Sequence, residues 1–217
     1  MSSFPQSPRV VHGGLVLLDP LTATVQRVIA LQYNPDTLTR SLQVQTIGEG
    51  DKTEALRMKA PPVETIKLEA DLDATDQLEF PDSNRGVVES GIQAQLAALE
   101  TIVYPTVAQL QTNNNLARQG TLEIVPMEGP LVLFVWSRYR IVPVRITELS
   151  VTEEAFDPKL NPIRARVSLG LRVLNVNDVG FDHKGGSLYL MYQQQKERFA
   201  AAARGVMTTS LGIGGIP

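Results

Sequence analysis

The chain has 217 residues, of which 43% are hydrophobic and 20% charged, a balance typical of a globular protein with one sizeable core. Its formal net charge of -3 argues against nucleic acid as a partner, and the complete lack of cysteine excludes disulfides and thiolate chemistry. The N-terminal residues do not resemble a secretory signal, and the longest apolar stretch is too short to span a bilayer. We therefore expect a soluble protein that is made in the cytoplasm and does not insert into a membrane.

Apolar residues alternate with polar ones through much of the chain, which indicates a mostly β architecture. Three N-terminal segments have this pattern, and Asn34-Pro35-Asp36 marks a turn between the second and the third. We expect the second and third segments to pair with each other within a meander. The three segments are 11–18, 25–33 and 38–44.

The alternation stops between Ile47 and Pro62, where glycine, charged residues and two prolines replace it. We predict a long loop here, and loops of this length in compact domains are commonly functional. We expect this loop to contact a neighbouring copy of the chain. Its candidate contact residues are Glu49, Asp51, Lys52, Arg57 and Lys59.

A strand with one solvated face is predicted at 66–72, and a helix at 84–104, where apolar residues form a single stripe. A second helical segment begins at Val107 and is expected to end in a loop at the polar residues 112–115. The helix predictions thus fall between two groups of strands.

The second half of the chain again has the period of β-strands. A turn-rich hexapeptide at 157–162 predicts a long hairpin, and a helix from Ser187 towards Gly205 follows. We divide the chain into a β domain at 1–177 and a C-terminal helix and tail at 178–217. The predicted strands are 122–125, 131–136, 142–147, 151–156 and 163–174.

No constellation for chemistry is evident in the sequence. The two histidines, His12 and His183, are far apart and lie beside glycines, without a supporting motif for a catalytic triad or a metal site. Neither the acidic run at 69–79 nor Gly48–Thr53 matches a calcium loop or a phosphate loop. We therefore predict no catalytic, cofactor-binding or metal-binding residues, and no enzyme.

Arginines form the one charge pattern that stands out, because they occupy alternate positions on segments predicted to be paired strands. Two interpretations remain open: an ordinary solvated sheet face, or an electrostatic contact with an acidic surface of another subunit. The candidate interface residues are Arg138, Arg140, Arg164 and Arg166, with Arg172 in the same pattern.

The segment LQYNPDTLTRSLQV, with its aromatic-Asn-Pro motif, resembles the opening of tube-domain proteins from contractile injection systems, which are phage-tail-like particles. APPVETIKLEADLDATD and GIQAQLAALETIVYP are similar to the strand block and helix that follow in that family. The hairpin region from GPLVLFVW to the FDPKLNPIRA turn continues the resemblance, which covers roughly 31–174.

The resemblance implies an antiparallel β-barrel or two-sheet sandwich with one packed helix, assembling as a hexameric ring without cofactors. The role implied is that of a baseplate tube adaptor, or tube initiator, with the inner tube protein, the central spike protein and other baseplate proteins as partners. We expect the C-terminal helix and tail to reach a baseplate or spike protein. Two alternatives stay open: an inner tube protein or tube terminator, and a small ligand-binding or hydrolytic β-domain. The final site of the particle is not implied.

Overall fold

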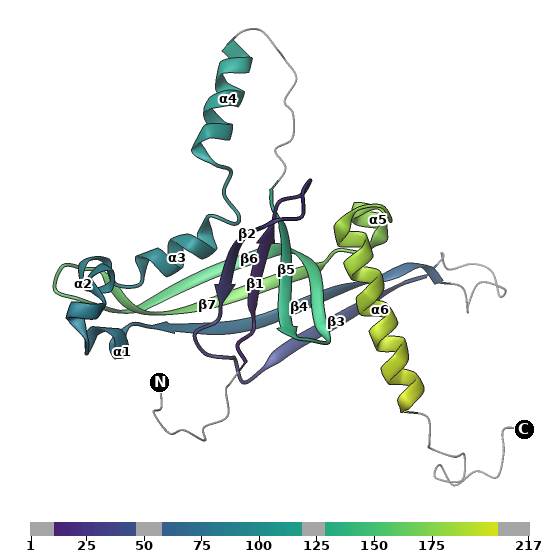
Figure 1. Cartoon of the computed structure of the whole chain (residues 1–217), viewed down its shortest axis with the longest axis horizontal. Coiled ribbons are helices and arrows are strands. Elements are labelled where there is room, and N and C mark those ends of the chain that lie inside the picture. Colours follow the sequence, from purple (N-terminus) through teal and green to yellow (C-terminus); the bar gives the residue numbers. More distant parts are fainter. Residues whose placement is uncertain (1–10, 47–57, 119–128, 204–217) are drawn as a thin grey trace, which may run out of the picture.

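The computed structural model describes residues 11–46, 58–118 and 129–203 (Figure 1). Within these ranges, seven strands form one antiparallel sheet in the order β2-β1-β5-β6-β7-β4-β3, and helices flank it. This confirms the α+β, mainly β fold class. The strands are β1 (Gly14–Leu18), β2 (Val25–Ala30), β3 (Leu38–Thr46), β4 (Met58–Asp73), β5 (Leu131–Ser137), β6 (Arg140–Phe156) and β7 (Pro162–Val173).

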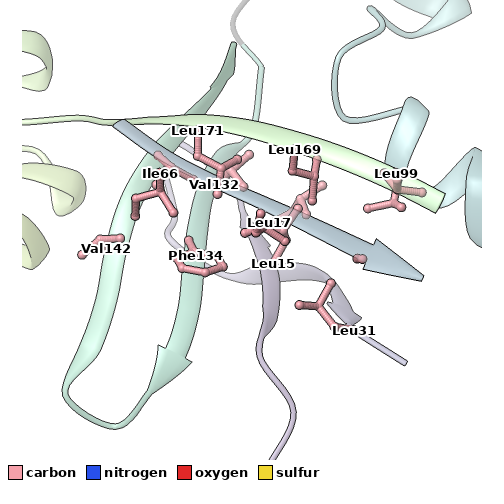
Figure 2. Close-up of a cluster of buried hydrophobic side chains, with 14 of the residues drawn as sticks. Leu15, Leu17, Leu31, Ile66, Leu99, Val132, Phe134, Val142, Leu169 and Leu171 are labelled. Carbon is pink, nitrogen blue, oxygen red and sulfur yellow. The ribbon is translucent and has the colours of Figure 1, made fainter. Parts of the chain in front are cut away.

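The core lies on the concave face of this sheet, where alternate residues of the central strands meet (Figure 2). Ile66 of β4, Leu171 of β7 and Val142 of β6 have no accessible surface at all. The predicted β6–β7 hairpin is confirmed, but the segments expected at 142–147 and 151–156 are a single long strand, β6. The strand predicted at 122–125 lies outside the described residues.

The expected pairing of the second and third strands is wrong, because β2 and β3 are the two opposite edges of the sheet. Residues 31–37 join these edges directly, so the sheet must curl until its ends approach each other. The Gln32 side chain spans the remaining gap: its Nε2 donates to the Asp73 carbonyl at 2.6 Å, and its Oε1 accepts from the Asp73 amide at 2.9 Å. One side-chain amide thus takes the place of a neighbouring strand at the end of β4.

β4 begins at Met58, so the last part of the predicted loop is strand instead. Pro61 and Pro62 lie within it, although proline cannot donate to a ladder. The structure explains this, because β7 pairs with β4 only from Thr65 onwards and the prolines face a single partner strand, β3. This half of β4 behaves as an edge strand.

The helix predicted at 84–104 is broken in two at Gly91. Gly91 adopts a φ of 59°, and an added Cβ would stand 2.0 Å from the Pro162 carbonyl oxygen. The amide of the next residue, Ile92, donates to that same oxygen at 2.8 Å, so the break holds the helices against the β6–β7 turn. The elements here are α1 (Thr75–Leu78), a 3-10 turn η1 (Pro81–Ser83), α2 (Arg85–Ser90) and α3 (Gln93–Glu100).

The loop expected at 112–115 is also wrong, because α4 (Val107–Arg118) runs through these asparagines. A reciprocal cap starts this helix: the Thr106 amide donates to the Gln109 side chain at 2.9 Å, and the Gln109 amide donates to the Thr106 hydroxyl at 3.2 Å. No residue of α4 is buried, and the helix projects from the body (Figure 1).

Two helices follow the sheet, α5 (Val176–Val179) and α6 (Lys184–Ala202). α6 begins three residues before the predicted start at Ser187, because the His183 side chain accepts from the Gly185 amide at 3.0 Å and caps the helix. α6 packs against β6, with Tyr189 and Tyr192 buried. No described helix combines the length and apolar character needed to cross a membrane.

Candidate assembly surfaces

The outer edges of β2 and β3 have no partner strand among the described residues. Beyond the point where β7 ends, β3 and β4 continue together as a two-stranded extension, which we call the arm: 42–46 of β3 and 58–64 of β4. Figure 1 shows these two strands running past α6 at one end of the sheet. Unpaired edges of this kind present backbone donors and acceptors that another chain can satisfy.

Exposed aliphatic side chains accompany both edges. On β3, Leu42 and Val44 occupy alternate positions that continue the core-facing side of the strand, but the core ends before them, and they are 52% and 62% exposed. On β2, Val25 and Val28 are similarly exposed. Aliphatic side chains that are exposed on a regular strand beside an open edge are typical of an interface between chains.

Glu64 is a buried carboxylate where the arm meets the body, with 3% of the residue exposed. Its Oε1 accepts from the Arg40 guanidinium at 2.6 Å and from the Tyr192 hydroxyl at 2.9 Å, and its Oε2 accepts from Lys196 at 3.0 Å. We call these four residues the Glu64 cluster. The cluster joins β3, β4 and α6, so the C-terminal helix is anchored at the base of the arm.

The cluster shifts the pKa of its members. Burial on its own would raise the pKa of Glu64, but the hydrogen bonds and charges of Lys196 and Arg40 outweigh it and the pKa is lowered. Burial and the neighbouring Glu64 carboxylate raise the pKa of Tyr192 to about 12. Glu64 is therefore an anion at neutral pH, and Tyr192 keeps its proton and donates a hydrogen bond to it.

Sequence reasoning missed the Glu64 cluster. Its members lie far apart in the chain, between position 40 and position 196, and Glu64 falls between the loop predicted to end at Pro62 and the strand predicted to begin at Ile66. One signal was available: Glu64 has the same parity as the buried positions Ile66 and Leu68, so it is the polar member of a core-facing row.

The predicted loop residues are only partly described. Lys59 lies on β4, exposed on the arm. The other four residues lie outside the described ranges: Glu49, Asp51, Lys52 and Arg57. Their contact with a neighbouring copy stays a prediction.

The arginines do not form one cluster. Arg164 and Arg166 lie on the outer face of β7, and the adjacent strand β4 supplies a carboxylate for each: Asp73 at 2.8 Å and Asp71 at 3.1 Å. Their charges are compensated within the chain. On this part of the face, the structure agrees with the ordinary solvated-sheet interpretation.

Arg138 and Arg140 lie at the other end of β6. Arg140 begins that strand, whereas Arg166 pairs with Thr152 of the same strand. Arg140 and Thr152 are separated by roughly 40 Å along β6, at the ~3.3 Å rise per residue of a strand. Arg138 belongs to the β5–β6 turn, beside α6. The expectation of a single arginine surface is therefore wrong, although the interface role of each pair remains a prediction.

A hollow of about 420 Å³ lies between β2, the ends of β4 and β7, and α3. Leu31, Leu72 and Leu99 contribute to its apolar lining, and the side-chain oxygens of Gln77 and Gln95 have no hydrogen-bond partner there. No histidine or carboxylate lines it. Within the described ranges, no three His, Asp or Glu side chains converge as a metal site.

Comparisons with known proteins give weak matches. No family model and no curated protein matches the sequence. Among solved structures, a chain from the tail of an empty gene transfer agent particle with C6 symmetry matches at 10% identity and a TM-score of 0.29, over 75% of this chain and 90% of that one. A chain from the virion of a native gene transfer agent particle matches at 11% identity and a TM-score of 0.27, over 74% and 90% of the two chains. TM-scores this low leave fold and function to be argued from the residues of the chain itself.

Proposed function

We propose that this protein is a structural, non-enzymatic subunit of a contractile, phage-tail-like injection particle, in which a ring of its copies joins the central spike and baseplate to the inner tube. The sequence resemblance over roughly 31–174 supports the class of particle. One structural observation carries the proposal: both edges of the sheet lack a partner strand within the described chain, and the arm exposes aliphatic side chains beside its open edge.

A ring is the expected assembly because the two open edges of the sheet, β2 and β3, differ from each other. When one surface of a subunit binds a different surface of the next copy, the contact repeats, and it closes into a ring if the rotation between copies allows it. Pairing of the arm with a neighbouring copy would satisfy the open edge of β3 and cover Leu42 and Val44 together. The mechanism is assembly, and the partners are further copies, the inner tube protein, the spike protein and other baseplate proteins.

The test is native mass spectrometry of the chain alone and with the tube and spike proteins encoded beside it. Wild type should form a discrete ring, alone or with these partners. The double variant Leu42→Lys/Val44→Lys should fold as wild type does, because both side chains are already solvated in the monomer. It should stay monomeric, because the change places two charges in the contact between copies.

Leu21→Lys/Leu160→Lys is the matched control, since these leucines are 90% and 78% exposed and lie in the β1–β2 and β6–β7 turns, outside the arm. The control should form rings as wild type does. Rings formed equally by the Leu42 and Val44 variant would contradict the assignment of the arm. Open-ended polymers would indicate an inner tube protein. A chain that stays monomeric and binds neither the tube protein nor the spike protein would refute the proposal.

A further inference from the structure

Two hollows of about 310 and 290 Å³ lie between the β5–β6 turn and α6; Tyr139 lines both of them, and Phe199 lines the smaller one. The two rings meet edge to face with their centroids 5.4 Å apart. We call the surface around this contact the α6 face. It is built from the turn and from one side of α6, which crosses the sheet (Figure 1).

Cationic side chains line both hollows, and no carboxylate does. The cations are Arg40, Arg138, Arg140, Lys196 and Arg198. Glu64 lies beneath them, buried and bound to Arg40 and Lys196, so one anion serves two cations. None of the ion pairs among the described residues involves the other three arginines. The α6 face therefore has an excess of positive charge in a chain whose net charge is -3.

Apolar and aromatic side chains lie between these cations, and they are exposed. Tyr139 is 44% exposed, Met191 53% and Phe199 51%. The Arg138 guanidinium lies 4.4 Å from the centroid of the Tyr139 ring, at the distance of a cation–π contact. Arginine, aromatic residues and methionine are the residue types enriched at protein interfaces.

We infer that the α6 face binds an acidic segment of another protein that also carries aromatic or aliphatic side chains. The carboxylates of such a segment would meet Arg138, Arg140 and Arg198, and its apolar side chains would enter the hollows beside Met191 and Tyr139. Charge complementarity selects the acidic partner, and the apolar lining selects a peptide over a phosphate backbone.

The α6 face is organised before binding. Tyr189 and Tyr192 are 7% and 6% exposed, and the Glu64 cluster holds α6 against the base of the arm. A partner therefore orders little of this surface on binding, which reduces the entropic cost. This inference goes beyond the proposed ring, because the α6 face includes neither the edge of β2 nor the exposed aliphatic side chains of the arm.

Deleting α6 would not test the inference, since the deletion removes buried tyrosines and would unfold part of the body. The test is a fluorescence anisotropy titration with a short labelled peptide of alternating glutamate and phenylalanine. The full-length wild type should bind this probe. Arg138→Glu/Arg198→Glu should weaken binding by about tenfold or more, because two attractive contacts become repulsive.

Arg85→Glu/Arg118→Glu is the matched control, with the same change of charge at exposed sites on α2 and α4. The control should bind the peptide as wild type does. Equal weakening in both double variants would show a general electrostatic effect and overturn the inference. So would undiminished binding of a glutamine version of the peptide, or tighter binding of a single-stranded oligonucleotide. Native mass spectra of the same variants report ring formation separately, so failure of the ring proposal would not be mistaken for failure at the α6 face.

Discussion

Replacing Glu64 by glutamine tests whether the Glu64 cluster stabilises the fold as the structure indicates. Glutamine has the shape of glutamate but no charge, and its oxygen can still accept from Arg40 and Tyr192. Its amide nitrogen, however, would face the Lys196 ammonium in place of the oxygen that now accepts at 3.0 Å. A charge-assisted hydrogen bond is therefore replaced by two opposed donors.

The expected loss is about 2 kcal/mol in the free energy of unfolding. Hydrogen bonds to charged groups contribute roughly 1.5–3 kcal/mol, and removal of one partner from a fully buried ion pair costs about 3–5 kcal/mol. The range for a single hydrogen bond to a charged group applies here, because the Lys196 side chain is 32% exposed and can turn towards water once its partner is lost.

The effect should depend on pH with a defined sign. The pKa of Glu64 is lowered in the folded chain from its usual value of 4.5, so its charge contributes stability that is complete above that value. The contribution is lost as the pH falls below 4.5 and through the folded pKa. The difference between wild type and Glu64→Gln should therefore shrink in acid.

The assay is urea unfolding followed by circular dichroism, at neutral pH and at successive pH values below 4.5. Glu69→Gln is the matched control, since Glu69 lies on the same strand with its side chain exposed. We expect the control to stay within about 0.5 kcal/mol of wild type. A Glu64→Gln variant as stable as the control, or one whose deficit does not change with pH, would refute the reasoning.

Two further predictions concern Gly91 and the Gln32 side chain. Gly91→Ala should destabilise the fold by about 1–3 kcal/mol, because the new Cβ would clash with the Pro162 carbonyl. The control is Gly86→Ala, whose new Cβ would have no atom within 4 Å, so this variant should melt no lower than wild type. Equal melting temperatures for the two variants would contradict the prediction. Gln32→Ala should speed hydrogen exchange at the Asp73 amide, because its acceptor is removed, and an unchanged exchange rate would show that the Gln32 side chain does not close the gap in the sheet.

The sequence was most informative where alternation is long and one face is buried. On β7, burial follows a period of two from Ala165 to Val173, apart from the buried Gly170, which is why the hairpin and its core face were predicted correctly. The pattern does not encode which strands become neighbours, so the pairing of β2 with β3 was wrong. Turn signals indicate that the chain bends, but β2 turns back onto β1 and leaves β3 to join β4 at the far edge.

The other differences have local causes that were present in the sequence. The Thr106–Gln109 cap has the spacing that marks a helix start, and it outweighs the low helix propensity of the asparagines that follow. Gly91 interrupts an apolar stripe that would otherwise suit a continuous helix. The Glu64 cluster could not be predicted in this way, because its four members meet only after β3, β4 and α6 have been brought together.

The sheet topology also sets the order in which the protein can fold. β1 forms a hairpin with β2 early in the chain, but its other neighbour is β5, about 120 residues later, where Gly14 pairs with Val135. Until β5 has left the ribosome, the inner edge of β1 is as open as the edges that remain in the finished chain. Contacts between residues this distant in sequence slow folding, and they prolong the time for which unpaired strand edges are exposed to aggregation. Assembly with other copies should therefore begin only after β5 has entered the sheet, because before that step the wrong edge is available to a neighbour.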